Sequence, residues 1–555
     1  MATYFFRNVG TAWNNTSSWS TVSSSGASAG TIPTALDTVT FDAGSANTCP
    51  VTTTNGVCLT LTTTGWTGTI TLNANLRVSG SITLSSTTTL AGTGYLGAIA
   101  TGTITATSVT IPYLMVGTGT AMTLTLGGNL TVTKFQLADV TIPVTYTINA
   151  NTINIAGDVI ITPIVSTGSV MTGTTVFNLN GTSNISDIGN GFNFAWSNPI
   201  TINTSGIITF GAFFNFNGSA LTYTAGTVDM TSNATLFRIG ANTTLNTGAM
   251  VFNTLQPAGT ITLTLSSNVI TNTLYFYHTA TQTTTVNGAF KVYIGNPDGS
   301  VGSLLHTAAG GSIITGTATL EFTGKGGVGY WTNWNILFSN SAVTYRVMNW
   351  NINITINTGG TIYILDKLNT ANNYSYTQLG GSKVFTYTAG NIITKTISAI
   401  QNIGLSFKGA TLSVATGHTL IGLNKIAFGR IILAAGGSFT MDEFPCGNAT
   451  VVTQMTSSSS TTNYTITLTS TANKNERVAN FIRVKNCTLA AANRNQVILT
   501  HPKANLGGNL NLRYYDVMNH GIPKFLETAQ PKYKSGKEIA YGAMGLVSDP
   551  NFASI

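Results

Sequence analysis

The residues able to carry catalysis are few in this chain and lie far apart. Among its 555 residues, 16 are Asp or Glu and five are His. Cleavage of a glycosidic bond needs two carboxyl groups about 5 to 9.5 Å apart, and the one adjacent acidic pair is Asp442-Glu443. Neighbouring strand residues point to opposite faces, so these two carboxyls flank one bond only if they lie in a loop. We therefore expect no catalytic residue, while acids from different parts of the fold keep glycan hydrolysis open.

Two short motifs imitate catalytic or phosphate-binding loops but lack the required context. Gly26-Ala-Ser-Ala-Gly30 fits the Gly-x-Ser-x-Gly pattern, yet Thr31-Ile-Pro33 follows it and no strand-to-helix turn is indicated. Gly324-Lys-Gly-Gly-Val-Gly329 resembles a phosphate-binding loop, but Tyr330 stands where Lys and Ser or Thr would be needed. The five His and four Cys show no metal-ligand spacing, so we expect no metal and no cofactor. Cys49 and Cys58 could pair across a hairpin, but for a protein that folds in a cytoplasm we expect two unpaired, buried thiols.

Aromatic residues are a stronger lead, because they indicate binding. Tyr330, Trp331 and Trp334 are followed by Trp350, which places three of the seven Trp within 20 residues. An exposed indole beside Asn and Thr offers a sugar both a stacking face and hydrogen bonds. Trp350 repeats Trp196 before the same segment, so we expect it in the core. Tyr330, Trp331 and Trp334 are the candidate ligand-binding residues, with core packing as the alternative.

These residues must be positioned by strands, because β patterns extend along almost the whole chain. Thr69–Leu72 and Ile261–Leu265 alternate apolar residues with Thr at period 2. In Leu72–Val78 and Leu126–Val132, an Asn separates two apolar runs, which predicts a strand, a tight turn and a strand. The one modest candidate for a helix is Pro523–Gln530, which begins with Pro.

The chain also contains an internal duplication. Trp196–Gly206 returns as Trp350–Gly360 at an offset of 154 residues, and Leu221–Val228 returns as Phe385–Ile392 at an offset of 164. The growing offset shows that residues were inserted between the matching segments. Units that tolerate tandem duplication contact mainly their neighbours, which is the property of a solenoid.

Composition favours stacked strands and divides the chain into three parts. Charged residues make up 7%, against about 25% in ordinary domains. Stacked rungs repeat each position at about 4.8 Å, so charges would repel, whereas Thr, Ser and Asn form hydrogen-bonded ladders. We predict an all-β chain with an N-terminal module (1–45), a parallel β-helix or β-solenoid shaft (46–471) and a separate, small C-terminal domain (472–555). The shaft includes the duplicated regions, at about 174–250 and 318–422.

The predicted C-terminal domain is basic. Eleven of the 24 Lys and Arg lie between Lys474 and Lys537, and five acids follow from Glu476 onward, which leaves +6 of the total charge of +8. This charge is either a solvated surface or a contact for an acidic partner. No apolar run reaches membrane-spanning length and Met1–Arg7 lacks signal-peptide character, so we expect synthesis in a cytoplasm without membrane insertion.

The N-terminal residues resemble a known family. Arg7-Asn-Val-Gly-Thr-Ala-Trp13, Ser18-Trp-Ser20, Pro33-Thr34 and Asp37-Thr-Val-Thr-Phe-Asp42 are similar to a module at the start of fibre proteins of environmental bacteriophages and of some bacterial adhesin-like proteins. The Thr, Asn and Gly repeats that follow resemble the β-helical shafts of tail or head fibres. The motif-like part covers only the first 45 residues, and the C-terminal domain resembles no family.

The resemblance implies a homotrimeric virion protein whose N-terminus binds a virion component and whose distal part binds a host surface glycan. Trp13, Trp19, Asp37 and Asp42 are then the candidate virion-attachment residues. The protein would be made in the host cytoplasm, act in the virion, become extracellular after release, and bind no nucleic acid. A tailspike glycan hydrolase and a bacterial surface adhesin are the alternatives.

Overall fold

The computed structural model of the chain is all-β, with short 3-10 turns as its only described helices. It divides into two compact units, Met1–Ile270 and Thr271–Ile555. Both are built from turns of a parallel β-solenoid between residues 38 and 489. The residues that the structure describes are 1–106, 108–138, 143–161, 168–185, 194–278, 281–295, 303–307, 313–323, 348–366, 374–378, 384–396, 407–414, 419–421, 428–441, 444, 452–468, 477–479, 482–493, 497–499, 507–510, 512–517 and 523–527.

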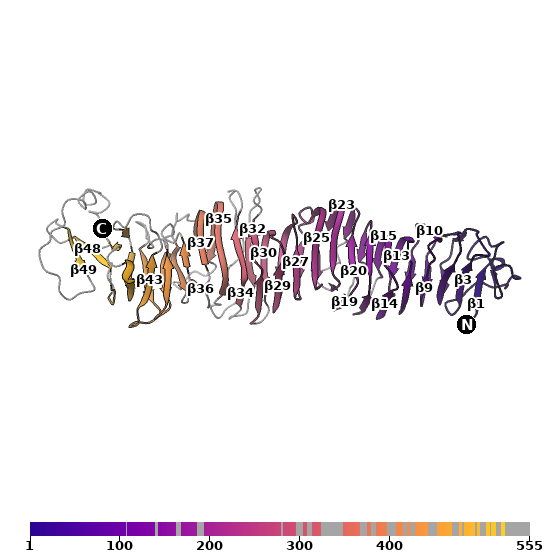
Figure 1. The fold of residues 1–555 in the computed structure, drawn as a ribbon, viewed down its shortest axis with the longest axis horizontal. Coiled ribbons are helices and arrows are strands. Elements are labelled where there is room, and N and C mark those ends of the chain that lie inside the picture. Colours follow the sequence, from indigo (N-terminus) through magenta and orange to yellow (C-terminus); the bar gives the residue numbers. More distant parts are fainter. Residues whose placement is uncertain are drawn as a thin grey trace. The chain divides into compact units, whose positions relative to one another are not determined.

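In the first unit, the parallel pairs between successive turns fall into three series of strands, which we call faces A, B and C. Figure 1 shows the strands of this unit stacked one after another, from β1 to β29. Face A comprises β1 (Thr3–Phe6), β3 (Thr38–Asp42), β6 (Thr60–Thr64), β9 (Ile82–Thr83), β12 (Gly102–Thr105), β14 (Met122–Leu126), β16 (Thr145–Asn149), β19 (Ser169–Thr172), β22 (Phe194–Trp196), β24 (Phe213–Phe216), β26 (Leu236–Ile239) and β28 (Val251–Pro257).

Faces B and C share several long strands that continue from one face to the next. Face B comprises β5 (Gly56–Cys58), β8 (Leu76–Val78), β11 (Leu96–Ala98), β13 (Thr110–Val116), β15 (Leu130–Leu137), β18 (Val159–Ile161), β21 (Ser183–Ile185), β23 (Ile200–Phe210) and β25 (Ala220–Asp229). Face C comprises β4 (Cys49–Val51), β7 (Thr69–Leu72), β10 (Thr89–Gly92), the first parts of β13, β15, β23 and β25, and β17 (Thr152–Ile155), β20 (Val176–Leu179), β27 (Thr243–Asn246) and β29 (Ile261–Leu265).

The core is a set of apolar columns that run from turn to turn. Leu61 pairs with Ile82, Ile82 with Ile104, and the next residue in register is Leu126, all fully or almost fully buried. Each buried aliphatic side chain contributes about 1.5–3 kcal/mol, so the stack depends on keeping this register. Outward-facing polar residues form the predicted ladders, as between Asn178 Nδ2 and Asn154 Oδ1 at 2.8 Å.

The N-terminal end of the sheet is covered by the chain itself. β1 pairs in parallel with β3 on one side and antiparallel with the short β2 (Trp19–Ser20) on the other. The 3-10 helix η1 (Thr16–Ser18) leads into β2, with Asn15 accepting a hydrogen bond from the Ser17 amide. An unpaired edge strand invites pairing with other chains, so this cover protects the end of the solenoid. We call residues 1–45 the N-terminal cap.

The second unit continues the same parallel pairing. Its strands are β30 (Val269–Tyr277, which begins in the first unit), β31 (Thr283–Asn287), β32 (Lys291–Ile294), β33 (Ser303–Thr307), β34 (Ile313–Phe322), β35 (Met348–Asp366), β36 (Tyr374–Gln378), β37 (Val384–Thr396), β38 (Phe407–Val414), β39 (Thr419–Ile421), β40 (Phe428–Leu433), β41 (Ser438–Met441), β42 (Thr453–Ser457), β43 (Tyr464–Leu468), β45 (Ile482–Lys485) and β46 (Cys487–Leu489). Parallel pairing passes residue 471, because β42 pairs with β45 and β43 with β46.

A small separate sheet contains β44 (Arg477–Ala479), β47 (Val497–Leu499), β48 (Arg513–Val517) and β49 (Pro523–Glu527), with the 3-10 helix η3 (Ala491–Asn493) before β47. The helix predicted from Pro523 is wrong, since Pro523–Glu527 pairs antiparallel with β48. A Pro at the first position of a strand with one partner removes no required hydrogen bond, so it fits β49 as well as it fits a helix start.

The two copies of the repeated sequence have the same strand register. β23 pairs with β25, and their copies β35 and β37 pair in the same way. In both copies the pairing register shifts directly after the repeated Ile-Thr-Ile segment. The matching pairs are Ile202–Tyr223 and Asn203–Ala225 in the first copy, and Ile356–Tyr387 and Asn357–Ala389 in the second.

Candidate functional site at the N-terminal end

Trp13 and Trp19 form the centre of the N-terminal cap. Their rings lie 5.0 Å apart at 73°, and the Trp19 indole Nε1 donates a 2.7 Å hydrogen bond to the carbonyl oxygen of Trp13. Phe6 from β1 packs 5.4 Å from Trp19. Both indoles are buried within the chain, so these two predicted attachment residues shape the cap from inside.

The same aromatic cluster joins the cap to the first turns of the solenoid. Phe41 of β3 lies 5.9 Å from Trp19 and 4.5 Å from Trp66, which precedes β7. Edge-to-face and tilted aromatic pairs each contribute about 0.5–1.5 kcal/mol beyond burial. Because the cap and the first turns of the solenoid share one aromatic core, the cap is packed firmly against these turns.

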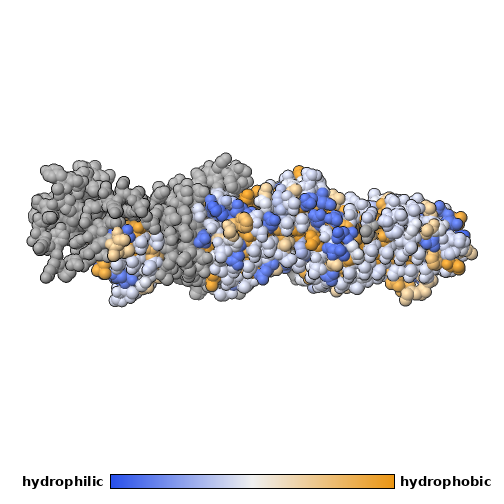
Figure 2. Space-filling view, viewed as in Figure 1, coloured by the Kyte–Doolittle hydropathy of each residue, from blue (hydrophilic) through white to orange (hydrophobic). Residues whose placement is uncertain are grey.

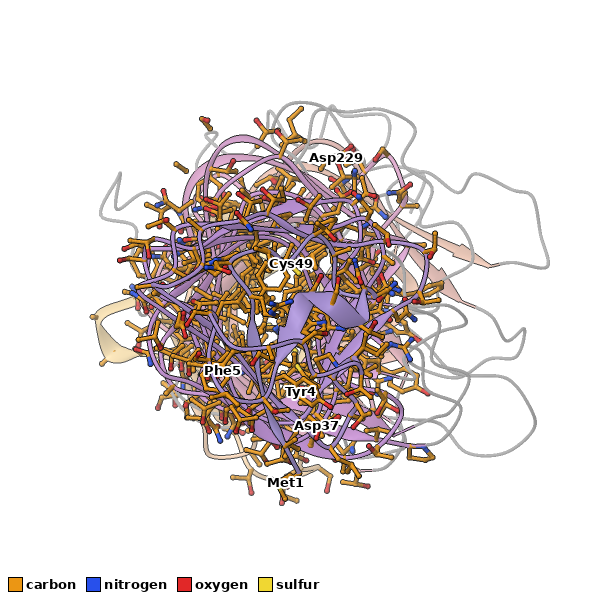
Figure 3. The ribbon with its side chains drawn as sticks, turned by 90° about the vertical axis from the view of Figure 1, so that its right-hand side faces the viewer. Met1, Tyr4, Phe5, Asp37, Cys49 and Asp229 are labelled. Carbon is orange, nitrogen blue, oxygen red and sulfur yellow. The ribbon has the colours of Figure 1, made fainter. Side chains whose placement is uncertain are left out.

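Asp37 and Asp42 hold backbone turns of the cap. Asp37 Oδ1 accepts a hydrogen bond from the Ala2 amide at 2.8 Å, and Oδ2 accepts from the Thr34 amide and hydroxyl at 3.0 and 2.6 Å. Burial would raise the pKa of Asp37, but these hydrogen bonds together outweigh it and lower the pKa. Asp42 Oδ1 accepts from the Gly44 amide at 2.9 Å. Figure 3 looks onto this end and shows Met1, Tyr4 and Asp37 on the same side of it.

The N-terminal cap also carries exposed aliphatic side chains. Among the described residues, nine large apolar side chains are exposed, and five of them lie in the first 36 residues. Val22 and Leu36 are the most exposed valine and leucine, at 76% and 69%. Figure 2 shows apolar surface at this end, at the right of the view. We call this surface the apolar rim, and it consists of Met1, Val9, Val22, Ile32 and Leu36.

The sequence pointed to the tryptophans of the cap and missed the rim. Val22 and Leu36 stand singly among Ser, Thr and Ala, and a lone aliphatic residue carries no pattern that separates surface from core. The other predicted binding residues, Tyr330, Trp331 and Trp334, lie outside the described residues. Trp196 is buried on β22, whereas the side chain of Trp350, the residue expected in the core, lies outside the described part of the structure.

The carboxylates with described side chains each serve a local contact. Asp229 accepts hydrogen bonds from Ser232 and Thr231, which lower its pKa to about 2. Glu321 forms an ion pair with Lys291 at 2.6 Å. Asp158 Oδ1 accepts a hydrogen bond from the Asn184 amide at 3.0 Å. In the described part of the chain, no group of three His, Cys, Asp or Glu lies close enough to hold a metal ion.

The cysteines that the structure describes are free and buried. Cys49 lies among the strands in the middle of the view in Figure 3. Burial raises the pKa of Cys487 to about 12 and raises that of Cys49 as well. The unpaired thiols expected at Cys49 and Cys58 are therefore confirmed, and Cys487 is free as well.

Comparison with protein-family models, with curated proteins and with solved structures finds no match for this chain. No helix among the described residues is long and apolar enough to cross a membrane.

Proposed function

We propose that this chain is a bacteriophage virion fibre protein, held to the particle by its N-terminal cap, that binds a host surface glycan without cleaving it. The observation that carries the proposal is the apolar rim, which gathers five of the nine exposed large apolar side chains of the described residues at one end. Apolar surface of this kind marks protein contacts. It coincides with the residues that resemble the attachment module of phage fibres.

The solenoid supports the rest of the proposal. Stacked turns with few charges suit a protein that presents a binding surface away from its attachment point. One weak glycan contact gains avidity when several copies are held together, which favours a homotrimer. The charge of +6 on residues 472–555 speeds encounter with an anionic cell surface.

The non-catalytic part of the proposal is supported by the carboxylates with described side chains. Glycan hydrolysis requires one carboxyl group that acts as an acid and another that acts as a base or nucleophile across the same bond. Asp37, Asp158, Asp229 and Glu321 instead bond to backbone amides or to Lys291.

The proposal is tested by placing charge on the rim. Val22→Asp and Leu36→Asp together should lower incorporation of the protein into particles at least tenfold, measured by quantitative mass spectrometry of purified virions. Both side chains are exposed, so the variant should fold and should still bind host cells as free protein. Ile207→Asp, at an exposed apolar residue on β23, is the control and should incorporate normally. Normal incorporation of the Val22 and Leu36 variant would contradict attachment through the rim.

A further inference from the structure

Face B carries a group of aromatic and basic side chains across four successive turns. Leu76 pairs with Leu96, Leu96 with Leu114, and Leu114 with Phe135. Tyr95 precedes Leu96, Tyr113 precedes Leu114 and Lys134 precedes Phe135, each by one residue. These three side chains therefore occupy one column. Arg77 stands one residue after Leu76 in the first of the four turns.

These side chains contact one another directly. The Arg77 Nε donates a 3.0 Å hydrogen bond to the Tyr95 hydroxyl, and its guanidinium lies 5.9 Å from the Tyr95 ring centre. The Tyr95 and Tyr113 rings are 5.8 Å apart at 73°. Lys134 Nζ lies 4.4 Å from the centre of the Tyr113 ring, and the Tyr113 hydroxyl donates to Gln136 Oε1. We call Arg77, Tyr95, Tyr113, Lys134 and Gln136 the tyrosine ladder.

The tyrosine ladder differs in residue type from the surrounding surface of the shaft. Farther along the same column, the positions hold Asp158, Asn184 and Thr209, the small polar residues typical of this shaft. Beside Tyr95, Gly97 has no side chain, and a Cβ there would lie 3.1 Å from Tyr95 Cε2. The Tyr95 ring therefore lies close against the strand, and all five ladder residues are half-buried rather than loose on the surface.

The two cations of the ladder have no anionic partner in the described structure. Residues 1–270 contain four Lys and Arg, of which two are in the ladder. Among the described residues, the ion pair found is Lys291–Glu321. The carboxylate next in the column, Asp158, bonds to the Asn184 amide and side chain. Arg77 and Lys134 are therefore held in place by aromatic rings while their charge stays uncompensated.

We propose that the tyrosine ladder binds an acidic polysaccharide, with sugar carboxylates at Arg77 and Lys134 and sugar ring faces against Tyr95 and Tyr113. Arg77 and Lys134 are three turns apart, about 14 Å at the spacing of strands. This span exceeds one sugar ring, so the ligand is a polymer lying along the solenoid axis. The site deepens the proposed function and rests on it, because it names the class of glycan.

The test is binding of the full-length protein to polygalacturonate and to dextran, measured by biolayer interferometry. Polygalacturonate carries a carboxylate on each sugar, and dextran is neutral. The protein should bind polygalacturonate at least tenfold more tightly than dextran, and less tightly as salt rises. Tyr95→Thr with Tyr113→Thr restores the residue type usual on this surface, and it should weaken polygalacturonate binding at least tenfold.

Two further variants separate the site from folding and from total charge. Lys134→Gln keeps both rings and should also weaken binding, which covers the case in which the double tyrosine variant fails to fold. Arg238→Gln removes the same charge from β26 on face A and should bind within twofold of the unchanged protein. Three results would overturn the inference. They are a loss of polygalacturonate affinity below tenfold in both ladder variants, a loss for Arg238→Gln equal to that of the ladder variants, and binding of the unchanged protein with no preference for polygalacturonate over dextran.

Adsorption to host cells tests the proposed function separately. If the unchanged protein adsorbs but the ladder variants bind polygalacturonate normally, the ladder site is overturned and the proposed function stands. If the unchanged protein adsorbs to no host cell, the proposed receptor function is overturned, whatever the polymer result.

Discussion

Asp37 ties the start of the chain to β3 through one carboxylate. Its two oxygens accept hydrogen bonds from Ala2 and Thr34, 35 and 3 residues away. The sequence singled out this residue, and Asp42, as part of a family-like motif, while their hydrogen bonds emerge only in the fold. It also marked Trp13 and Trp19, but an aromatic residue packs equally well inside its own chain or against a partner. The structure places both rings inside.

Acid should loosen the N-terminal cap through Asp37. Its folded pKa is lowered below the unfolded value of about 3.9, so its stabilising effect is present above that value and is lost as pH falls through the folded pKa. Asp37→Asn should destabilise the cap at pH 7 by about 1–3 kcal/mol, as expected for lost hydrogen bonds to a charged group. Hydrogen exchange of the β1 amides reports both effects.

Hydrogen exchange of the β1 amides should become similar in the unchanged protein and in Asp37→Asn as the pH falls. At a pH below the folded pKa of Asp37, exchange in the unchanged cap should approach that of Asp37→Asn at the same pH, because the carboxyl is then protonated. A difference between the two proteins that stays constant as the pH is lowered through this range would contradict this role.

At the level of elements, the alternation of apolar residues and Thr predicts single strands well. Thr69–Leu72 and Ile261–Leu265 are β7 and β29 as predicted, because the side-chain period of a strand is set locally. Columns across turns are harder to predict. From Leu76 to Leu96 a turn takes 20 residues, and from Leu96 to Leu114 it takes 18, so no fixed period aligns Tyr95 with Tyr113. The tyrosine ladder therefore becomes visible only with the register.

The repeated Tyr-Thr-Ala-Gly segment has a structural reason at the same level. Tyr223 donates a 2.6 Å hydrogen bond from its hydroxyl to the carbonyl oxygen of Gly226, which adopts a φ of 112°. A Cβ on Gly226 would lie 2.5 Å from Thr204 Cγ2 and 2.8 Å from its carbonyl oxygen. The duplication keeps this Gly because the turn needs both the left-handed backbone and close approach.

Gly226→Ala should therefore destabilise the first unit by about 1–3 kcal/mol or more, from backbone strain and a clash with the neighbouring turn. Gly30→Ala is the matched control, because Gly30 also has a positive φ of 69° but nothing lies within 4 Å of its added Cβ. Thermal unfolding followed by circular dichroism should show a larger loss for Gly226→Ala. Equal losses would mean that the close approach to Thr204 is unimportant.

For the whole molecule, we predict a homotrimer. Fibres of the family that the N-terminal residues resemble are usually trimeric, and avidity makes several copies of a weak glycan site effective. Light scattering coupled to size exclusion should give a mass of three 58.0 kDa chains. A stable monomer at micromolar concentration would contradict self-assembly in solution. Val22→Asp with Leu36→Asp then shows whether the rim contributes to assembly as well as to attachment.

The closed edge of β1 also determines the order in which the chain can fold during synthesis. β2 covers one side of β1, so later turns add on the side of β3. The ribosome delivers β1–β3 before any later strand, and each emerging turn meets a finished template. On face A, a nascent chain therefore presents one growing edge, that of its newest strand. For a sequence rich in Thr, Ile and Val with 7% charged residues, this limits the strand edge available for aggregation at each moment of translation.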